Sequence, residues 1–160
     1  MDIISRVIEI LEDEGLDCVV LEEKVAVKTG LTGESGDWIC NVERINMADE
    51  IDAVAALSRY VEAVPEGHRN DAALLANAIN SRMLAVGSFD VDMTDGEVVY
   101  RSSLAFSVDA DVNDAALRLM LLINWTEIDR YIPLFDAISA GEPVAEVIAL
   151  LDEGDDSDEE

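Results

Sequence analysis

The sequence predicts an α+β domain in which an antiparallel β-sheet packs against helices. Two adjacent patterns in the second half of the chain lead to this prediction. Residues 87–101 read GSFDVDMTDGEVVYR, with alternating apolar residues on both sides of a turn, as in a β-hairpin. A long amphipathic helical pattern follows and includes the segment WTEIDRYIPLF at residues 125–135. A hairpin and a helix that each have one apolar face bury those faces against each other.

Composition indicates one domain. The chain has 160 residues, of which 50% are hydrophobic, and this is enough for a substantial core. We expect a single domain over residues 1–151 and an acidic, disordered tail over residues 152–160. No apolar run reaches the length of a membrane span, and the first residues lack the pattern of a signal peptide. We therefore expect a cytoplasmic protein.

The first half of the chain predicts one helix followed by strands. Apolar residues recur at helical spacing from Asp2 to Glu14, and Gly15 is suited to end that helix. The following patterns predict, in order, strands within residues 18–27 separated by a turn at 22–24, a loop at 29–37 and a strand at 38–45. Residues 50–64 fit either a helix or a strand, because alanines alternate there with β-branched and aromatic residues.

The second half predicts helix, hairpin, helix, helix. A helix is expected at residues 66–83, with Leu74, Leu75, Ala78, Ile79 and Met83 facing inward. In the hairpin, one face carries Phe89, Val91 and Met93, and Asp95-Gly96 favours a type I′ turn. Asn113 is suited to cap the long helix, and a last short helix is expected at residues 144–151. The apolar stripe of the long helix consists of Leu117, Met120, Leu121, Asn124, Ile128, Tyr131, Ile132, Phe135 and Ile138.

The net charge of −26 restricts the partners. Such a charge repels phosphate backbones and anionic lipid, so we expect neither nucleic-acid nor membrane binding. It attracts basic proteins and cations instead. Lys24 and Lys28 are the only lysines among the 10 basic residues, and an acid-rich, lysine-poor surface suits a protein kept soluble in high salt. A halophilic source is therefore a hypothesis.

Several motifs with a possible chemical role favour a structural interpretation. Glycines at positions 30, 33 and 36 lack the Lys-Ser/Thr and the helix start of a phosphate loop. The aspartates at positions 90, 92 and 95 do not keep the spacing of a calcium loop, and Glu127, Asp129 and Arg130 fit a solvated helix face.

The residues that most often catalyse or bind metal are also few. His68 is the only histidine, and Cys18 and Cys40 fit buried free thiols. We expect no catalytic residue, no cofactor and no metal site.

Four large aromatic residues with polar groups are the candidates for an interface. Trp and Tyr dominate the binding energy of many protein interfaces, although the same residues also pack in cores and at core edges. Both interpretations stay open for Trp38, Tyr60, Trp125 and Tyr131.

The segment from Trp38 to Leu151 resembles the YbjN family of bacterial sensory transduction regulators. The features that carry the resemblance are the Trp that opens a strand, the step VPE at 64–66, the hairpin GSFDVD…DGEVVYRSSL at 87–104 and the helix segment DRYIP at 129–133. The resemblance implies a strand at residues 50–64. It also implies a fold like that of type III secretion chaperones, which are commonly dimers and bind proteins, and it transfers no catalytic residue.

These observations together predict a non-enzymatic regulatory or chaperone-like protein-binding module, with an unidentified protein partner and a homodimeric state. The alternative is an acidic surface protein that binds basic proteins or cations through its charge.

Overall fold

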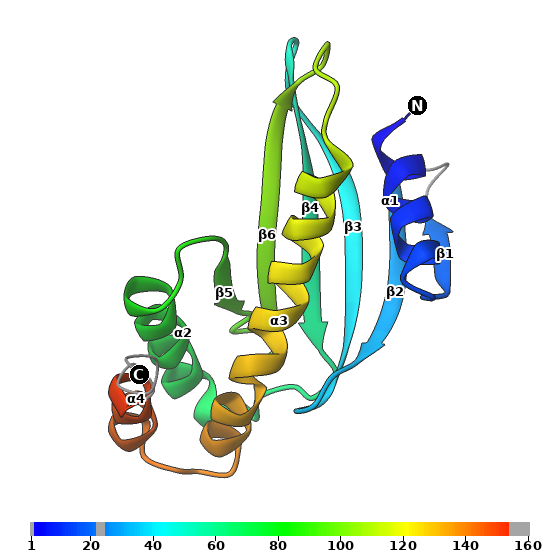
Figure 1. Ribbon diagram of the computed structural model, residues 1–160. Coiled ribbons are helices and arrows are strands. Elements are labelled where there is room, and N and C mark those ends of the chain that lie inside the picture. Colours follow the sequence, from blue (N-terminus) through cyan, green and yellow to red (C-terminus); the bar gives the residue numbers. More distant parts are fainter. Residues whose placement is uncertain (1, 22–24, 154–160) are drawn as a thin grey trace, which may run out of the picture.

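Residues 2–21 and 25–153 are described by the structure, a computed structural model of the chain (Figure 1). The first half contains, in order, α1 (Ile3–Asp13), β1 (Cys18–Leu21), β2 (Ala26–Thr32), β3 (Asp37–Ala48) and β4 (Ile51–Tyr60). The second half contains a 3₁₀ turn (Glu66–His68), α2 (Arg69–Arg82), β5 (Ser88–Val91), β6 (Val98–Ser107), α3 (Asp114–Ser139) and α4 (Val144–Glu153).

One antiparallel sheet contains all of these strands in the order β1-β2-β3-β4-β6-β5. The long helix α3 lies along one face of the sheet over β4 and β6, and α1 lies beside it over the edge formed by β1, β2 and β3 (Figure 1). Helices α2 and α4 pack together at the end of the sheet that carries β5. The predicted α+β class with an antiparallel sheet against helices is confirmed.

Helix α3 forms as the sequence predicts. The side chain of Asn113 accepts a hydrogen bond from the backbone N–H of Ala115 at 2.7 Å and so caps the helix. Every residue of the predicted apolar stripe is buried, including Asn124. Buried aliphatic side chains from α1, β3, β4 and β6 meet this stripe, and together they form the core. The period of the stripe therefore determined which face of α3 covers the sheet.

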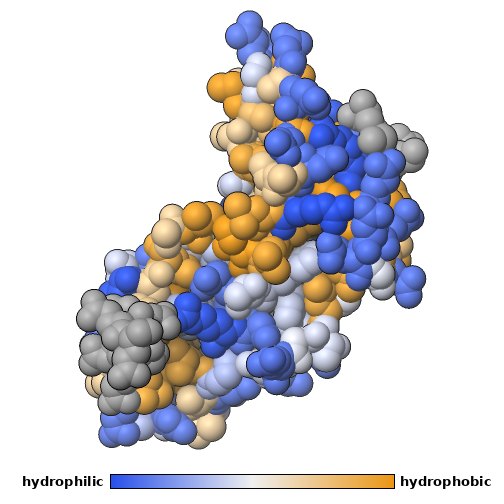
Figure 2. Space-filling view, viewed as in Figure 1, coloured by the Kyte–Doolittle hydropathy of each residue, from blue (hydrophilic) through white to orange (hydrophobic). Residues whose placement is uncertain are grey.

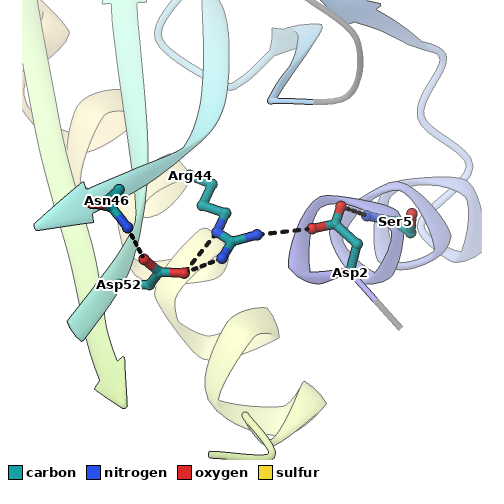
Figure 3. Close-up of polar contacts among 5 residues, drawn as sticks. All are labelled: Asp2, Ser5, Arg44, Asn46 and Asp52. Carbon is teal, nitrogen blue, oxygen red and sulfur yellow. Dashed lines mark hydrogen bonds and ion pairs between the residues drawn. The ribbon is translucent and has the colours of Figure 1, made fainter. Parts of the chain in front are cut away.

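Helix α1 is attached to the sheet and to α3 by arginine ion pairs. Arg6 pairs with Asp114 and Asp111 beside the start of α3, whereas Arg118 on α3 reaches back to the end of α1. Arg44 on β3 donates from Nε to the buried carboxylate of Asp52 at 2.7 Å, and its Nη1 lies 3.5 Å from Asp2, the cap of α1 (Figure 3). Each end of α1 thus forms an ion pair with an arginine of another element, Arg44 of β3 at its start and Arg118 of α3 at its end.

Strand β4 is central and buried on both faces from Asp52 to Ser58. Its pairing with β3 and β6 settles the ambiguity of residues 50–64 in favour of a strand, as the resemblance implied. The alanines that suggested a helix are buried at the centre of the sheet instead.

In the first half of the chain, the structure differs from the predicted lengths of one loop and one strand. The loop expected at residues 29–37 is shorter, because β2 continues through Gly30, which pairs with Ile39 of β3, to Thr32. Pairing with β3 outweighs the low strand propensity of glycine at position 30. Only residues 33–36 connect the two strands. The turn expected at residues 22–24 lies outside the described residues. The strand expected at 38–45 is longer, from Asp37 to Ala48.

Several predictions about the second half differ from the structure. Leu74 of α2 is 55% exposed instead of inward, because α2 packs through the side of the helix that carries Leu75 and Ile79. Met93 is 49% exposed, because the hairpin loop begins before it. Backbone bonds from Asp92 to Glu97 and from Gly96 to Asp92 close a loop longer than a two-residue type I′ turn. Of the expected tail, residues 152 and 153 belong to α4, and the remainder lies outside the described residues.

Candidate protein-binding surface

An apolar groove lies between the C-terminal half of α1 and the exposed side of α3. Its volume is about 290 Å³, and the residues that line it are Ile10, Glu14, Arg118, Leu119, Leu121, Leu122 and Trp125. Leu119 and Leu122 are 56% and 57% exposed, on the opposite side of the helix from the buried stripe. Large exposed aliphatic side chains next to each other on a helix are typical of an interaction site.

The space-filling view shows the apolar character of this region. A cluster of hydrophobic residues, drawn in orange, crosses the middle of the molecule over α3, between hydrophilic areas (Figure 2). At the rim of the groove Arg118 pairs with Asp13 at 2.6 Å and with Glu14 at 2.7 Å. The floor is therefore apolar, and the rim is charged with an excess of acid.

The structure places the four candidate aromatic residues in different surroundings. Trp38 and Tyr131 are only 4% and 3% exposed, so here they are core residues. Tyr131 packs edge-on against Phe89, with 5.5 Å between the ring centroids. Trp125 is half-buried and lines the groove. Its indole Nε1 has no hydrogen-bond partner among the described residues. Of the four, Trp125 alone combines accessibility with a place in the groove.

Tyr60, at the end of β4, is attached to α3. Its hydroxyl donates to the carboxylate of Asp136, with oxygen distances of 3.0 and 3.3 Å. Burial and the neighbouring Asp136 carboxylate raise the pKa of Tyr60 to about 12, because both disfavour the phenolate. This contact fixes the end of the sheet against the helix, which is a structural role.

A second, wider hollow lies beside the β2–β3 loop, on the other side of Trp125. Its volume is about 1020 Å³, and Trp38, Trp125 and Asp129 are among its lining residues. The carboxylate of Asp129 accepts hydrogen bonds from the backbone N–H groups of Glu34 and Ser35 at 3.0 and 2.9 Å. The sequence predicts Asp129 on a solvated helix face, whereas the structure shows it bound to this loop. No local signal connects residues so far apart in the chain.

The chemically active side chains named from the sequence are dispersed. Cys18 and Cys40 are free thiols, and His68 lies at the start of α2. Burial raises the pKa of Glu127, whose Oε2 has no partner among the described residues. Within residues 2–21 and 25–153, no group of three His, Cys, Asp or Glu side chains is arranged to hold a metal ion. In that same part of the chain no helix combines the length and the apolarity of a membrane span.

The aspartates of the hairpin cap backbone groups. The side chains of Asp92 and Asp95 accept from the N–H groups of Thr94 and Glu97 at 2.7 and 2.9 Å. These bonds lower the pKa of Asp92, because they stabilise its carboxylate form. These aspartates, whose spacing partly resembled a calcium-binding loop, therefore stabilise the hairpin loop through hydrogen bonds to its backbone.

Comparison with known proteins agrees with this fold. The sequence pattern of the YbjN family, described as "Putative bacterial sensory transduction regulator", matches residues 4–137. A solved structure titled "Crystal structure of YbjN, a putative transcription regulator from E. coli" superposes with a TM-score of 0.55 at 18% identity, over 83% of this chain and 89% of that chain. No curated protein matches the chain. The family pattern covers most of the sequence, and this chain belongs to the YbjN family.

Proposed function

We propose that this chain is a non-enzymatic regulatory module that binds another protein through the groove between α1 and α3. One observation carries the proposal: Leu119 and Leu122 are both more than half exposed beside Trp125, over an apolar floor. The family description as a regulator supports a binding role and a non-enzymatic one.

The chemistry of the groove suits an amphipathic helix. Its volume, about 290 Å³, is at the lower limit for a small-molecule site, whereas a helix inserts one or two apolar side chains and extends along the groove. The rim carries Asp13 and Glu14, and the whole chain has a net charge of −26. A partner helix with basic residues beside its apolar face therefore complements this surface.

A substitution within the groove tests the proposal. The full chain serves as bait for native host lysate in about 0.1 M KCl and in molar KCl, alongside Leu122→Glu and the control Leu74→Glu. The control residue is 55% exposed on α2, against 57% for Leu122, and lies outside the groove. We expect a stoichiometric partner that wild type and Leu74→Glu retain and Leu122→Glu loses. A partner that binds all three chains equally would contradict the proposal that it binds in the groove. Binding that disappears at modest salt would favour attraction through charge alone.

A further inference from the structure

One face of the sheet is not covered by a helix. Cys40, Ser58 and Ser102 point toward α3, so the odd-numbered residues of their strands point to the opposite face, because side chains alternate along a strand. Figure 1 shows α1 and α3 in front of the sheet and no helix of the described residues behind it. We define the open face as the odd-numbered residues within 39–45 of β3, 53–59 of β4 and 99–105 of β6.

The open face is largely apolar and nearly neutral. An antiparallel sheet with one face in water usually carries polar residues on that face. Here seven of the twelve outward residues are apolar, and Ile45 is 38% exposed. The charged residues are Glu43, Arg59 and Arg101, which leave one net positive charge in a chain whose net charge is −26. Two copies of the chain therefore repel each other less where these faces meet than where their acidic surfaces meet.

The strand register makes the open face symmetric about β4. Each outward residue of β4 lies between one residue of β3 and one residue of β6, as Leu57 lies between Asn41 and Arg101. If two open faces stack with a twofold axis along β4, the axis exchanges β3 of one copy for β6 of the other. Each outward residue of β3 then faces the residue of β6 that belongs to its own row.

We propose that a second copy of this chain packs on the open face in this arrangement, so that the two sheets form a sandwich about 10 Å thick. The first and last of the four rows support it. Ile45 faces Ala105 of the other copy, and Ile39 faces Val99 of the other copy, so apolar residues meet apolar residues. The rows repeat on both sides of the axis, and each contact is therefore made twice.

The two middle rows pair donors with acceptors. Oδ1 of Asn41 is buried and has no hydrogen-bond partner among the described residues. Arg101 is exposed, and no ion pair joins it to another described residue. In the proposed dimer the guanidinium of Arg101 faces the amide of Asn41, and the hydroxyl of Ser103 faces the carboxylate of Glu43. The match in every row indicates a second copy as the occupant.

The centre and the size of the open face are also suitable. Ala53 and Ala55 lie on the axis, where small side chains let the two sheets approach. Arg59 lies near the axis too, but its Nε donates to Glu97 at 3.1 Å, and this carboxylate compensates its charge. Strands about 4.8 Å apart and rows about 7 Å apart give a face of the order of 500 Å² in plane from β2 to β6. The relief of the side chains raises the accessible area toward the roughly 800 Å² per partner of a stable interface.

Sedimentation equilibrium of the full chain in about 2 M KCl provides the first test, because that salt screens the repulsion between copies. We expect a dimer with a dissociation constant of roughly 1–100 µM, at the weak end for an interface of this size. Ala105→Glu should weaken it at least about tenfold, since each copy then places a carboxylate against Ile45 of the other. The control Ala115→Glu adds the same charge to an exposed alanine of α3 and should leave the dimer unchanged.

Leu122→Glu, which alters the groove, should also leave the dimer intact, so this inference and the proposed function can fail separately. A wild type that stays monomeric over this concentration range would overturn the proposal. Equal weakening by Ala105→Glu and Ala115→Glu would overturn it as well.

A strengthening substitution decides the matter even if Ala105→Glu fails to fold. Ser103→Lys places an ammonium group opposite Glu43 of the other copy and should tighten the dimer at least about threefold. Glu43→Gln in the same chain should remove this gain, because within one copy the two residues lie two strands, about 10 Å, apart. Ala115→Lys changes the net charge equally and should have less than about a twofold effect. Equal effects of the two lysines, or a gain that survives Glu43→Gln, would refute the arrangement.

Discussion

Asn124 of α3 accepts a hydrogen bond from the hydroxyl of Ser58 on β4 at 2.5 Å, with both residues fully buried. Its amide nitrogen donates to the backbone oxygen of Ala56 at 3.0 Å and lies 3.1 Å from the hydroxyl of Ser102 on β6. One side chain thus joins the helix to both central strands. Because a buried polar group is costly unless its partners are present, this network permits only one alignment of α3 on the sheet.

Asn124→Ala should reduce the free energy of unfolding by about 2–4 kcal/mol. The substitution creates a small cavity, takes the acceptor in Asn124 away from the buried hydroxyl of Ser58, and removes the amide bond to the carbonyl of Ala56. Denaturant titration at constant high salt measures the loss. The control is Thr126→Ala on the exposed side of the same helix, expected within about 0.5 kcal/mol of wild type. Similar losses in both variants would contradict the importance of the network.

Arg44→Ala should destabilise the fold by about 2–4 kcal/mol, because it leaves the buried carboxylate of Asp52 without its cation. Arg82→Ala removes an exposed ion pair to Asp152 and should cost less than about 1 kcal/mol. Both are measured by denaturant titration in the same buffer. If Arg44→Ala proves as mild as Arg82→Ala, water or Asn46, which donates to Asp52 at 3.1 Å, compensates for the lost arginine.

Gly33→Ala should reduce the free energy of unfolding by about 1–3 kcal/mol, since the added Cβ would overlap Oδ1 of Asp129. The β2–β3 loop would have to shift, which would break its bonds to that carboxylate. Gly30→Ala has no atom within 4 Å of its new Cβ and should change stability by less than about 1 kcal/mol. Thermal unfolding of both variants checks this pair. An unchanged melting temperature of Gly33→Ala would show that the β2–β3 loop accommodates the added methyl group with little loss of stability.

The tyrosines should ionise at a higher pH in the folded chain than in the unfolded chain. The pKa values of Tyr60 and Tyr100 are raised to about 12 by burial, with nearby carboxylates adding to the effect, and that of Tyr131 is also raised. A raised pKa in the folded state means that the unfolded chain loses its protons first. Stability is therefore kept below pH of about 10 and lost as the pH rises from about 10 to 12.

Phenolate absorbance near 295 nm checks this directly. Native protein should show little signal at pH of about 10.5, whereas denatured protein at the same pH should show most of it. Tyr60→Phe should reduce the difference in absorbance between native and denatured protein, because it removes one tyrosine whose pKa is raised in the folded chain. Native and denatured titrations that coincide would contradict the described burial of the tyrosines.

Thermal stability should rise with salt if the chain comes from a halophilic source. Screening removes the self-repulsion of a net charge of −26 but also weakens the exposed ion pairs of α1, each worth about 0–1 kcal/mol. Repulsion should dominate, and we expect the melting temperature to rise by at least about 10 °C between 0.1 and 2 M KCl, or roughly 3 kcal/mol. Calorimetry provides the measurement, with NaCl as a second salt. Equal melting temperatures would remove the case for a halophilic origin.

Local periodicity was sufficient for α1 and α3. The buried stripe of α3 follows from the spacing of its apolar residues, and Asn113 caps the helix because a side-chain oxygen at that position reaches the backbone of the first turn. The burial of Asn124 follows from the same spacing, because it stands on that stripe. These features depend only on residues a few positions apart, so the sequence alone determined them.

Contacts between distant segments decided the rest. Strand β2 continues through Gly30 because β3 pairs with it, and Asp129 binds a loop that lies 94 to 95 positions earlier in the chain. The depth of Trp38 and the exposure of Leu74 and Leu122 likewise depend on which neighbours cover them. Burial is a property of the assembled layers and has no local period of its own. The groove between α1 and α3 therefore became visible only in the tertiary structure.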